Sequence, residues 1–394
     1  MPDPALQSTD MLLILRGLAA VAVMLRHMPL ALSLFGVDLE FLVNPFGYIP
    51  VVMFFALSGY LVTKTFFIQR YNVYTLAGLR EYYRNRTLRI IPLYYLTIIV
   101  CALLYWKRSV QSPFDVLSLF AVVGAYKQPG GIIFNHVYWT LPIEMLFFLL
   151  APFIFMLLGR LVLIIKWYGL LLLVGLVYVG YSIYLFQSFD MVEGAILMDR
   201  STWNQLAHQD FIYNLEAFII GALANFVTTA TSGKIAESAN LRHLLWCAVI
   251  GIVVFVVLRG CYVGDVLFAK QLVDPFTLYG LLPMVSMAVF ILALLQETQC
   301  HHESESRSKF RTYAVYYLEW IGLLSYGIYL WHVPVRDMVV HFSGLSDTYA
   351  SLLAMLLTLL VSVLTYHFFE RHFMKYRSKE FISKRHVDQW GNGV

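Results

Sequence analysis

Residues 140–158 have the sequence TLPIEMLFFLLAPFIFMLL, in which the one ionisable side chain is Glu144. An α-helix of this length extends about 28 Å, close to the thickness of the hydrocarbon core of a bilayer. A strand that crosses a bilayer needs only about 9–11 residues, so the run is too long for a barrel strand. The segment therefore predicts a membrane-spanning helix.

The composition of the whole chain agrees with this prediction. Hydrophobic residues make up 60% of the 394 residues and charged residues 13%, and the mean hydropathy is +0.70. Ordinary globular domains have about 45–50% apolar residues and about 25% charged residues. This composition therefore excludes a soluble or disordered chain. Four widely spaced cysteines with no C-x-x-C pair exclude a disulfide scaffold. The sequence has no basic patch interleaved with aromatics in its polar segments, so no nucleic-acid partner is expected.

Ten stretches of about 17–25 residues are long and apolar enough to cross a bilayer. They lie near 11–33, 46–66, 87–106, 140–159, 167–186, 211–229, 242–259, 276–296, 318–338 and 349–370. A further apolar stretch, 114–126, is too short to cross comfortably and is expected to be interfacial or re-entrant. The fold class predicted is all-α, a polytopic integral membrane protein with about ten transmembrane helices and this one short helix.

The distribution of basic residues gives the orientation. With a cytoplasmic N-terminus, 19 of the 28 Lys and Arg fall in cytoplasmic segments and 7 in outer segments, as the positive-inside rule requires. If 114–126 crossed, the basic loops at 297–317 and 371–386 would face outward. We therefore expect both termini in the cytoplasm, a membrane domain over 1–372 and a short basic tail over 373–394. The first span lacks the basic start and small-residue cleavage site of a signal peptide.

Ionisable side chains inside a span cost roughly 2.5–3.5 kcal/mol on insertion scales, so those present are candidates for function. Arg16 and His27 share the first span and are 11 residues apart. That spacing places them on one face of a helix, about 16 Å apart along its axis. The structural alternative is that Arg16 snorkels to the cytoplasmic interface while His27 bonds a neighbouring helix.

Glu144 lies about one turn inside the outer end of its span, at a depth similar to that of His27. A histidine beside a carboxylate is the usual arrangement of a general base, because the carboxylate fixes the imidazole tautomer. The sequence therefore predicts that His27 and Glu144 meet. The alternative is that Glu144 pairs with Arg26 or Lys127 at the interface.

Two further groups of polar residues lie on single helix faces. Arg86 and Arg89 are one turn apart, and arginine pairs suit phosphate; the alternative is that they bind anionic lipid or only set the topology. Ser325 and His332 lie on neighbouring positions of the ninth span, where interhelical hydrogen bonding is the alternative to a functional role. The segment from Phe54 to Tyr60, which includes Gly59, predicts a packing notch of small residues.

Taken in order along the chain, these motifs resemble the acyltransferase-3 family of membrane O-acyltransferases. The similar segments are Arg16 through His27 (R-x10-H), Phe54 to Leu61 (FF-x-LSG-(F/Y)-L), Arg86 to Tyr94 (R-x-x-R-I-x-P-L-Y), Trp139 to Glu144 (W-S-L-x-x-E), Gly322 to His332 (G-x-x-SYGIYLWH) and Phe369 to Arg371. The sequence departs from the family pattern at Leu13, Thr140 and His372, where the family often has an acidic residue, a serine and a proline.

The resemblance implies a multi-pass protein of the bacterial inner membrane. It also implies an acyl-CoA donor, often acetyl-CoA, that enters from the cytoplasm. It implies transfer to a hydroxyl of a surface polysaccharide, such as lipopolysaccharide, or of a lipid-linked glycan, without a metal. The roles implied are catalysis for His27 and Glu144, donor binding for Arg16, Arg86 and Arg89, and substrate binding for Trp139, Ser325, Tyr326 and His332. The hydrolase-like domain fused to some members is not expected here.

A transporter or flippase for a glycolipid is the alternative function, since it also has many spans and buried ionisable groups. It would move its substrate without consuming acyl-CoA. Many transporters contain internal repeats, and the sequence shows none that is convincing. A purely structural membrane partner fits poorly with so many polar groups at matched depths.

Overall fold

The structure, a computed structural model, describes residues 10–28, 33–34, 37–38, 48–68, 70–109, 113–122, 134–186, 190–192, 195–199, 211–268, 272–273, 285–293, 295 and 309–376. This part of the chain is almost entirely helical. Four of its helical segments are long and apolar enough to cross a membrane: Ile49–Phe67, Leu76–Leu104, His136–Ile165 and Asp347–Met374. The prediction of a helical membrane protein is confirmed, while the number of ten spans stays a prediction.

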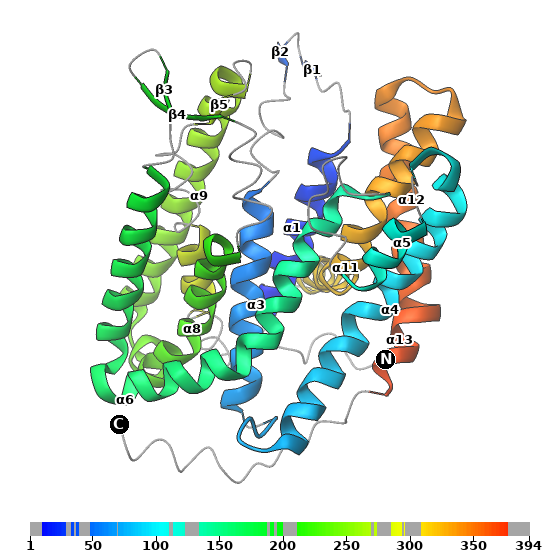
Figure 1. Cartoon of the computed structure of the whole chain (residues 1–394). Helices are drawn as coiled ribbons and strands as arrows, with labels where there is room; N and C mark the ends of the chain where they lie inside the picture. The colour runs from blue at the N-terminus through cyan, green and yellow to red at the C-terminus, as the bar shows by residue number, and fades with distance from the viewer. Residues whose placement is uncertain are drawn as a thin grey trace.

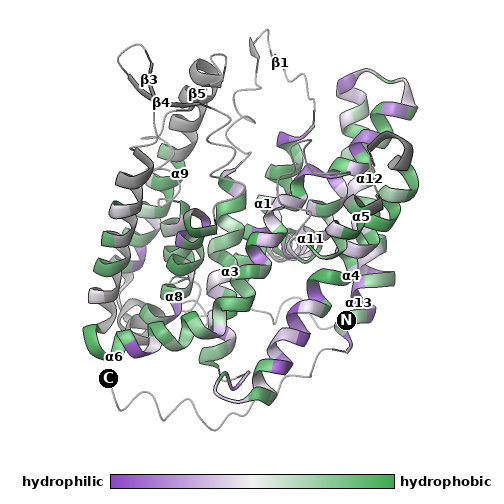
Figure 2. Ribbon diagram, viewed as in Figure 1, coloured by the Kyte–Doolittle hydropathy of each residue, from purple (hydrophilic) through white to green (hydrophobic). Residues whose placement is uncertain are grey.

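The helices are α1 (Met11–Arg26), α3 (Ile49–Phe67), α4 (Leu76–Ser109), α5 (Pro113–Phe120), the 3₁₀ helix η4 (His136–Trp139), α6 (Thr140–Phe186), α8 (Phe211–Glu237), α9 (Ala239–Phe268), α11 (Lys309–Ser343), α12 (Asp347–Thr365), the π-helix η5 (Tyr366–Glu370) and α13 (Arg371–Met374). Short antiparallel strands pair β1 (Ser33–Leu34) with β2 (Val37–Asp38), and β4 (Ala195–Asp199) with both β3 (Asp190–Val192) and β5 (Leu272–Val273). In Figure 1, α1, α3 and α11 occupy the middle of the bundle. Figure 2 shows hydrophobic residues along most helices and hydrophilic ones on the lower part of α4.

Two of the predicted spans have boundaries that differ clearly from those in the structure. The fourth and fifth predicted spans are one helix, α6, which descends and turns upward again in Figure 1, because no proline interrupts residues 153–186. Helix α4 begins 11 residues before the predicted third span, so its arginines lie within the helix. Most of the tail, 377–394, and the first part of the eighth predicted span, 276–284, lie outside the described residues.

Helices α1 and α11 run parallel and touch at a pair of glycines. A Cβ atom added to Gly17 would lie 2.7 Å from the backbone nitrogen of Gly322. Ten residues further along each helix, His27 and His332 are in contact. The two glycines and the two histidines have the same sequence separation, 305 positions, as expected for helices that run in the same direction. Glycines that let two backbones approach are a common device of membrane helix packing. The glycine contact therefore sets the register that brings the two histidines together.

Helices α3 and α8 form a second parallel pair. Added Cβ atoms on Gly59 and Gly221 would collide with the backbones of Phe218 and Ala56, which confirms the predicted packing notch. Further along, the Nδ2 of Asn225 donates to the backbone oxygen of Tyr60 over 2.7 Å. The hydrogen bond supports the close approach with a polar contact between the helices.

The short helix α5 packs on α4 through two tyrosines. The hydroxyl groups of Tyr94 and Tyr95 donate to the backbone oxygens of Leu119 and Phe120, over 2.9 and 2.7 Å. With eight residues, α5 is too short to cross a bilayer. This agrees with the expectation that residues 114–126 do not form a span, although 123–126 are outside the described part.

Candidate active site

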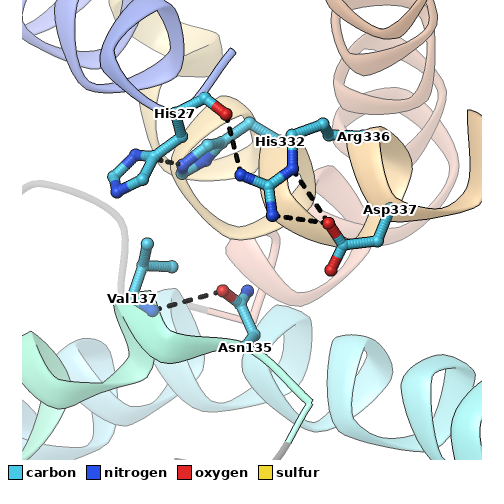
Figure 3. Close-up of polar contacts among 6 residues, drawn as sticks. All are labelled: His27, Asn135, Val137, His332, Arg336 and Asp337. Atoms are coloured by element: carbon cyan, nitrogen blue, oxygen red, sulfur yellow. Dashed lines mark hydrogen bonds and ion pairs between the residues drawn. The ribbon is translucent and has the colours of Figure 1, made fainter. Parts of the chain in front are cut away.

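A pair of histidines lies where the end of α1 meets α11. His27 is the C-terminal cap of α1, and its Nδ1 lies 3.1 Å from Nε2 of His332 (Figure 3). His332 is fully buried, whereas His27 retains some exposed surface. Two helices far apart in the sequence thus place two imidazoles in direct contact.

Backbone carbonyls fix the tautomers of the neutral pair. The Nδ1 of His332 lies 3.1 Å from the carbonyl oxygen of Ile328, which can only accept, so this nitrogen carries the proton. The Nδ1 of His27 lies 2.9 Å from the carbonyl oxygen of Val23 and carries its proton for the same reason. The single N–H of His27 is therefore shared, and Nε2 of neutral His332 also accepts from it. Nε2 of His27 is left with its lone pair, as a general base requires.

Arg336 holds the backbone of His27 in place. Its NH1 donates to the carbonyl oxygen of His27 over 2.8 Å, and its Nε donates to Oδ1 of Asp337 over 2.9 Å (Figure 3). The cation sits at the C-terminal end of α1, where a positive charge is favourable. The sequence reasoning counted Arg336 only as an outer basic residue. Its position one helical turn after His332 was the feature of the sequence that could have indicated a role near that histidine.

A third imidazole, His136, also approaches the pair. Its ring centroid lies 4.7 Å from that of His27 at an angle of 58°. Sequence reasoning missed this residue, although it lies three positions before Trp139 in a segment that had been singled out. Among the described residues, no group of three or more His, Cys, Asp or Glu could hold a metal ion.

Glu144 belongs to a separate cluster with the arginines. Its Oε1 accepts a hydrogen bond from the hydroxyl of Ser58 over 2.9 Å, and its charged neighbours are Arg16, Arg89 and Arg86. The structure therefore brings together the three arginines that were predicted as one donor-binding group. The guanidinium of Arg86 also lies over the rings of Tyr82 and Phe148, 5.6 and 5.3 Å from their centroids.

The contact expected between His27 and Glu144 is not formed. In the described part of the chain, no hydrogen bond or ion pair joins the two side chains, which have the different partners given above. The physical reason is the spacing in η4 and α6. His136 takes the place beside His27, and Glu144 lies eight residues further on, roughly 13 Å along the helix.

Tyr329 connects the two groups. Its ring centroid is 6.0 Å from that of His332, its hydroxyl lies 3.0 Å from the hydroxyl of Thr140, and it lies within the electrostatic reach of Glu144. The polar residues from the arginines to His27 are partly or fully buried. We define them as the polar column, which consists of Arg16, Arg86, Arg89, Glu144, Tyr329, His332 and His27.

The other predicted substrate-binding residues have structural contacts. Trp139 is buried and stacks on Tyr48, with the centroids 6.0 Å apart. The hydroxyl of Tyr326 donates to the backbone oxygen of Ile90 over 2.9 Å. The hydroxyl of Ser325 is buried and has no hydrogen-bond partner among the residues described. None of these contacts tests a role in binding substrate.

The polar column has a cationic group around Glu144 at one end and a pair of histidines in contact at the other. The chain belongs to the family described as "Acyltransferase domain", whose model matches residues 12–367. It is 25% identical over 353 residues to the O-acetyltransferase OatA of Staphylococcus aureus, covering 85% of this chain and 54% of the relative. It is 23% identical over 401 residues to the peptidoglycan O-acetyltransferase OatA of Listeria monocytogenes, covering 90% and 54%.

The chain thus spans about half the length of the curated relatives that it matches. A comparison with solved structures finds no match.

Proposed function

We propose that this protein is a membrane O-acetyltransferase that moves an acetyl group from acetyl-CoA to a hydroxyl of a cell-surface glycan. The observation that carries the proposal is the polar column, in which three arginines surround Glu144 at one end and Nε2 of His27 keeps its lone pair at the other. Peptidoglycan is the acceptor named for the Listeria relative and is the acceptor that we propose to test first.

We further propose ten crossings of a bacterial plasma membrane, with both termini in the cytoplasm. The two parallel helix pairs support this topology. With ten spans that alternate in direction, α1 and α11 both run outward and α3 and α8 both run inward. Had 114–126 been an additional crossing, α3 and α8 would run in opposite directions. The arginine cluster then lies toward the cytoplasm and His27 toward the outer face.

The arginine cluster is suited to the phosphates of coenzyme A. Guanidinium groups bind phosphate oxygens through two parallel hydrogen bonds, and Arg16, Arg86 and Arg89 supply three of them around Glu144. The carboxylate of Glu144 partly balances their charge, so we assign Glu144 to the donor end. The thioester arm would follow α1 over the 16 Å or so between Arg16 and His27.

At the outer end, His27 serves as the general base. Its Nε2 takes the proton from the acceptor hydroxyl while the hydroxyl oxygen forms a bond to the thioester carbonyl carbon. The carbon–sulfur bond breaks, and the proton on His27 passes to the departing thiolate. One ester and one free thiol result, and His27 returns to its neutral form.

His332 is a positioning residue, because it accepts from Nδ1 of His27 and so keeps the lone pair on Nε2. Replacing His332 by leucine is expected to lower kcat about 10- to 100-fold while the KM for acetyl-CoA changes little, since the donor end is untouched. His332→Gln should recover part of the activity, because its amide oxygen can accept from the same N–H. Equal losses in the leucine and glutamine variants would contradict this assignment.

The function is tested with the purified protein in vesicles, labelled acetyl-CoA on one side and peptidoglycan glycan strands on the other. Wild-type protein is expected to place label on the glycan. Arg86→Met should raise the KM for acetyl-CoA about 10-fold, the equivalent of one lost charge-assisted contact of about 1.4 kcal/mol. The matched control is Arg84→Met, because Arg84 lies on the same helix but is exposed.

Movement of the glycan across the vesicle membrane without loss of acetyl-CoA would overturn the proposal in favour of a transporter. Equal donor KM values for Arg86→Met, Arg84→Met and the wild type would show that the arginine cluster binds lipid or only sets topology.

A further inference from the structure

We propose that His136 belongs to the acceptor site and holds the sugar hydroxyl beside Nε2 of His27. This inference rests on the proposed function and names the part of the outer end that receives the acceptor. The chemical class of ligand is a sugar hydroxyl, which both donates and accepts hydrogen bonds.

The backbone of His136 is fixed by its neighbours. Asn135 precedes it as the cap of η4 and accepts from the backbone nitrogen of Val137 over 3.2 Å. The side-chain Nδ2 of Asn135 donates to the backbone oxygen of Leu330 on α11 over 2.9 Å. Asn135 and Val137, whose hydrogen bond is drawn in Figure 3, are buried. His136 between them is exposed. A rigid turn thus presents one imidazole at the surface.

The ring of His136 is available for a ligand. Its centroid lies 4.7 Å from that of His27, and among the described residues it takes part in no hydrogen bond. Val23, His332 and Arg336 already hold the Nδ1 and the carbonyl oxygen of His27. His136 is therefore an imidazole beside His27 whose ring nitrogens are not held by any described residue.

The charged groups nearby favour a hydroxyl over an anion. Arg336 and Asp337 are the charged neighbours of His136, and the guanidinium of Arg336 is already paired with Asp337 and bonded to His27. Its charge is thus largely compensated within the chain. The side chain of Asp337 is 41% exposed and offers oxygens that accept from sugar hydroxyls.

In the arrangement proposed, an N–H of His136 donates to the oxygen of the acceptor hydroxyl, and that hydroxyl donates its own proton to Nε2 of His27. The two imidazoles then fix both the position and the direction of the O–H bond. Orientation of this kind lowers the entropic cost of bringing the reacting groups together.

The test replaces His136 by phenylalanine, which keeps an aromatic ring of similar shape but removes both nitrogens. The KM for glycan strands in the vesicle assay is expected to rise about 5- to 10-fold, the equivalent of one lost hydrogen bond, while the KM for acetyl-CoA stays within about twofold. The affinity for glycan strands measured without a donor should fall by a similar factor. His136→Asn should recover part of the binding, because its amide can donate. The control is His341→Phe, an exposed histidine at the end of α11.

Unchanged glycan KM and affinity in His136→Phe, with active wild-type protein, would overturn the inference and leave the proposed function in place. A loss confined to kcat would also overturn it, because it would assign His136 to the chemical step. Inactive wild-type protein would instead overturn the proposed function, and with it this inference.

Discussion

Replacing His27 by asparagine is expected to lower the rate of acetyl transfer at least 100-fold. The asparagine amide can still donate to the carbonyl oxygen of Val23 and to His332, so the end of α1 keeps its contacts. It has no nitrogen with a lone pair at the position of Nε2, and general bases contribute typically 10²–10⁴-fold. The measurement is kcat for labelled glycan in the vesicle assay.

Two controls separate loss of the base from loss of structure. The binding of acetyl-CoA to His27→Asn should match that of the wild type, because Arg16, Arg86 and Arg89 lie at the other end of the polar column. The melting temperature in detergent should stay within a few degrees. Wild-type kcat in this variant would remove His27 from the chemistry, whatever its neighbours are.

Replacing Gly221 by valine is expected to destabilise the protein more than any single change at the site. The added side chain would collide with the backbone of Ala56, where α8 and α3 run parallel. A backbone cannot move aside as a flexible side chain can, so the cost should reach or exceed the roughly 1–3 kcal/mol typical of overpacking. We expect little monodisperse protein after extraction, and a melting temperature lowered by several degrees in what remains.

The matched control for this change is Gly251→Val on α9. An added Cβ there meets no atom within 4 Å, so the substitution adds the same side chain in a helix without a backbone collision. A Gly221→Val protein as stable as the Gly251→Val protein would contradict the close packing of α3 on α8. The comparison also separates packing from the helix propensity of valine, which is the same in both variants.

The polar residues of the site were visible in the sequence because charge inside an apolar span is costly. That reasoning found Arg16, His27, Glu144 and His332, whereas the family resemblance implied donor binding for Arg86 and Arg89. Helical periodicity gave the shared face of Arg16 and His27, because that relation lies within one helix. It could not show which residue on another helix lies opposite His27, since that depends on the register between helices.

The amino-acid sequence by itself determined that the chain is a helical membrane protein, because long apolar runs have no other stable form in a bilayer. It also indicated candidate residues for chemistry and the packing notch at Gly59. The tertiary structure alone decided the partners. The contact of Gly17 with Gly322 sets α1 against α11 so that His27 meets His332 rather than Glu144. Sequence reasoning gave no role to Arg336 or His136, because their significance comes from distance in space to a histidine on another element.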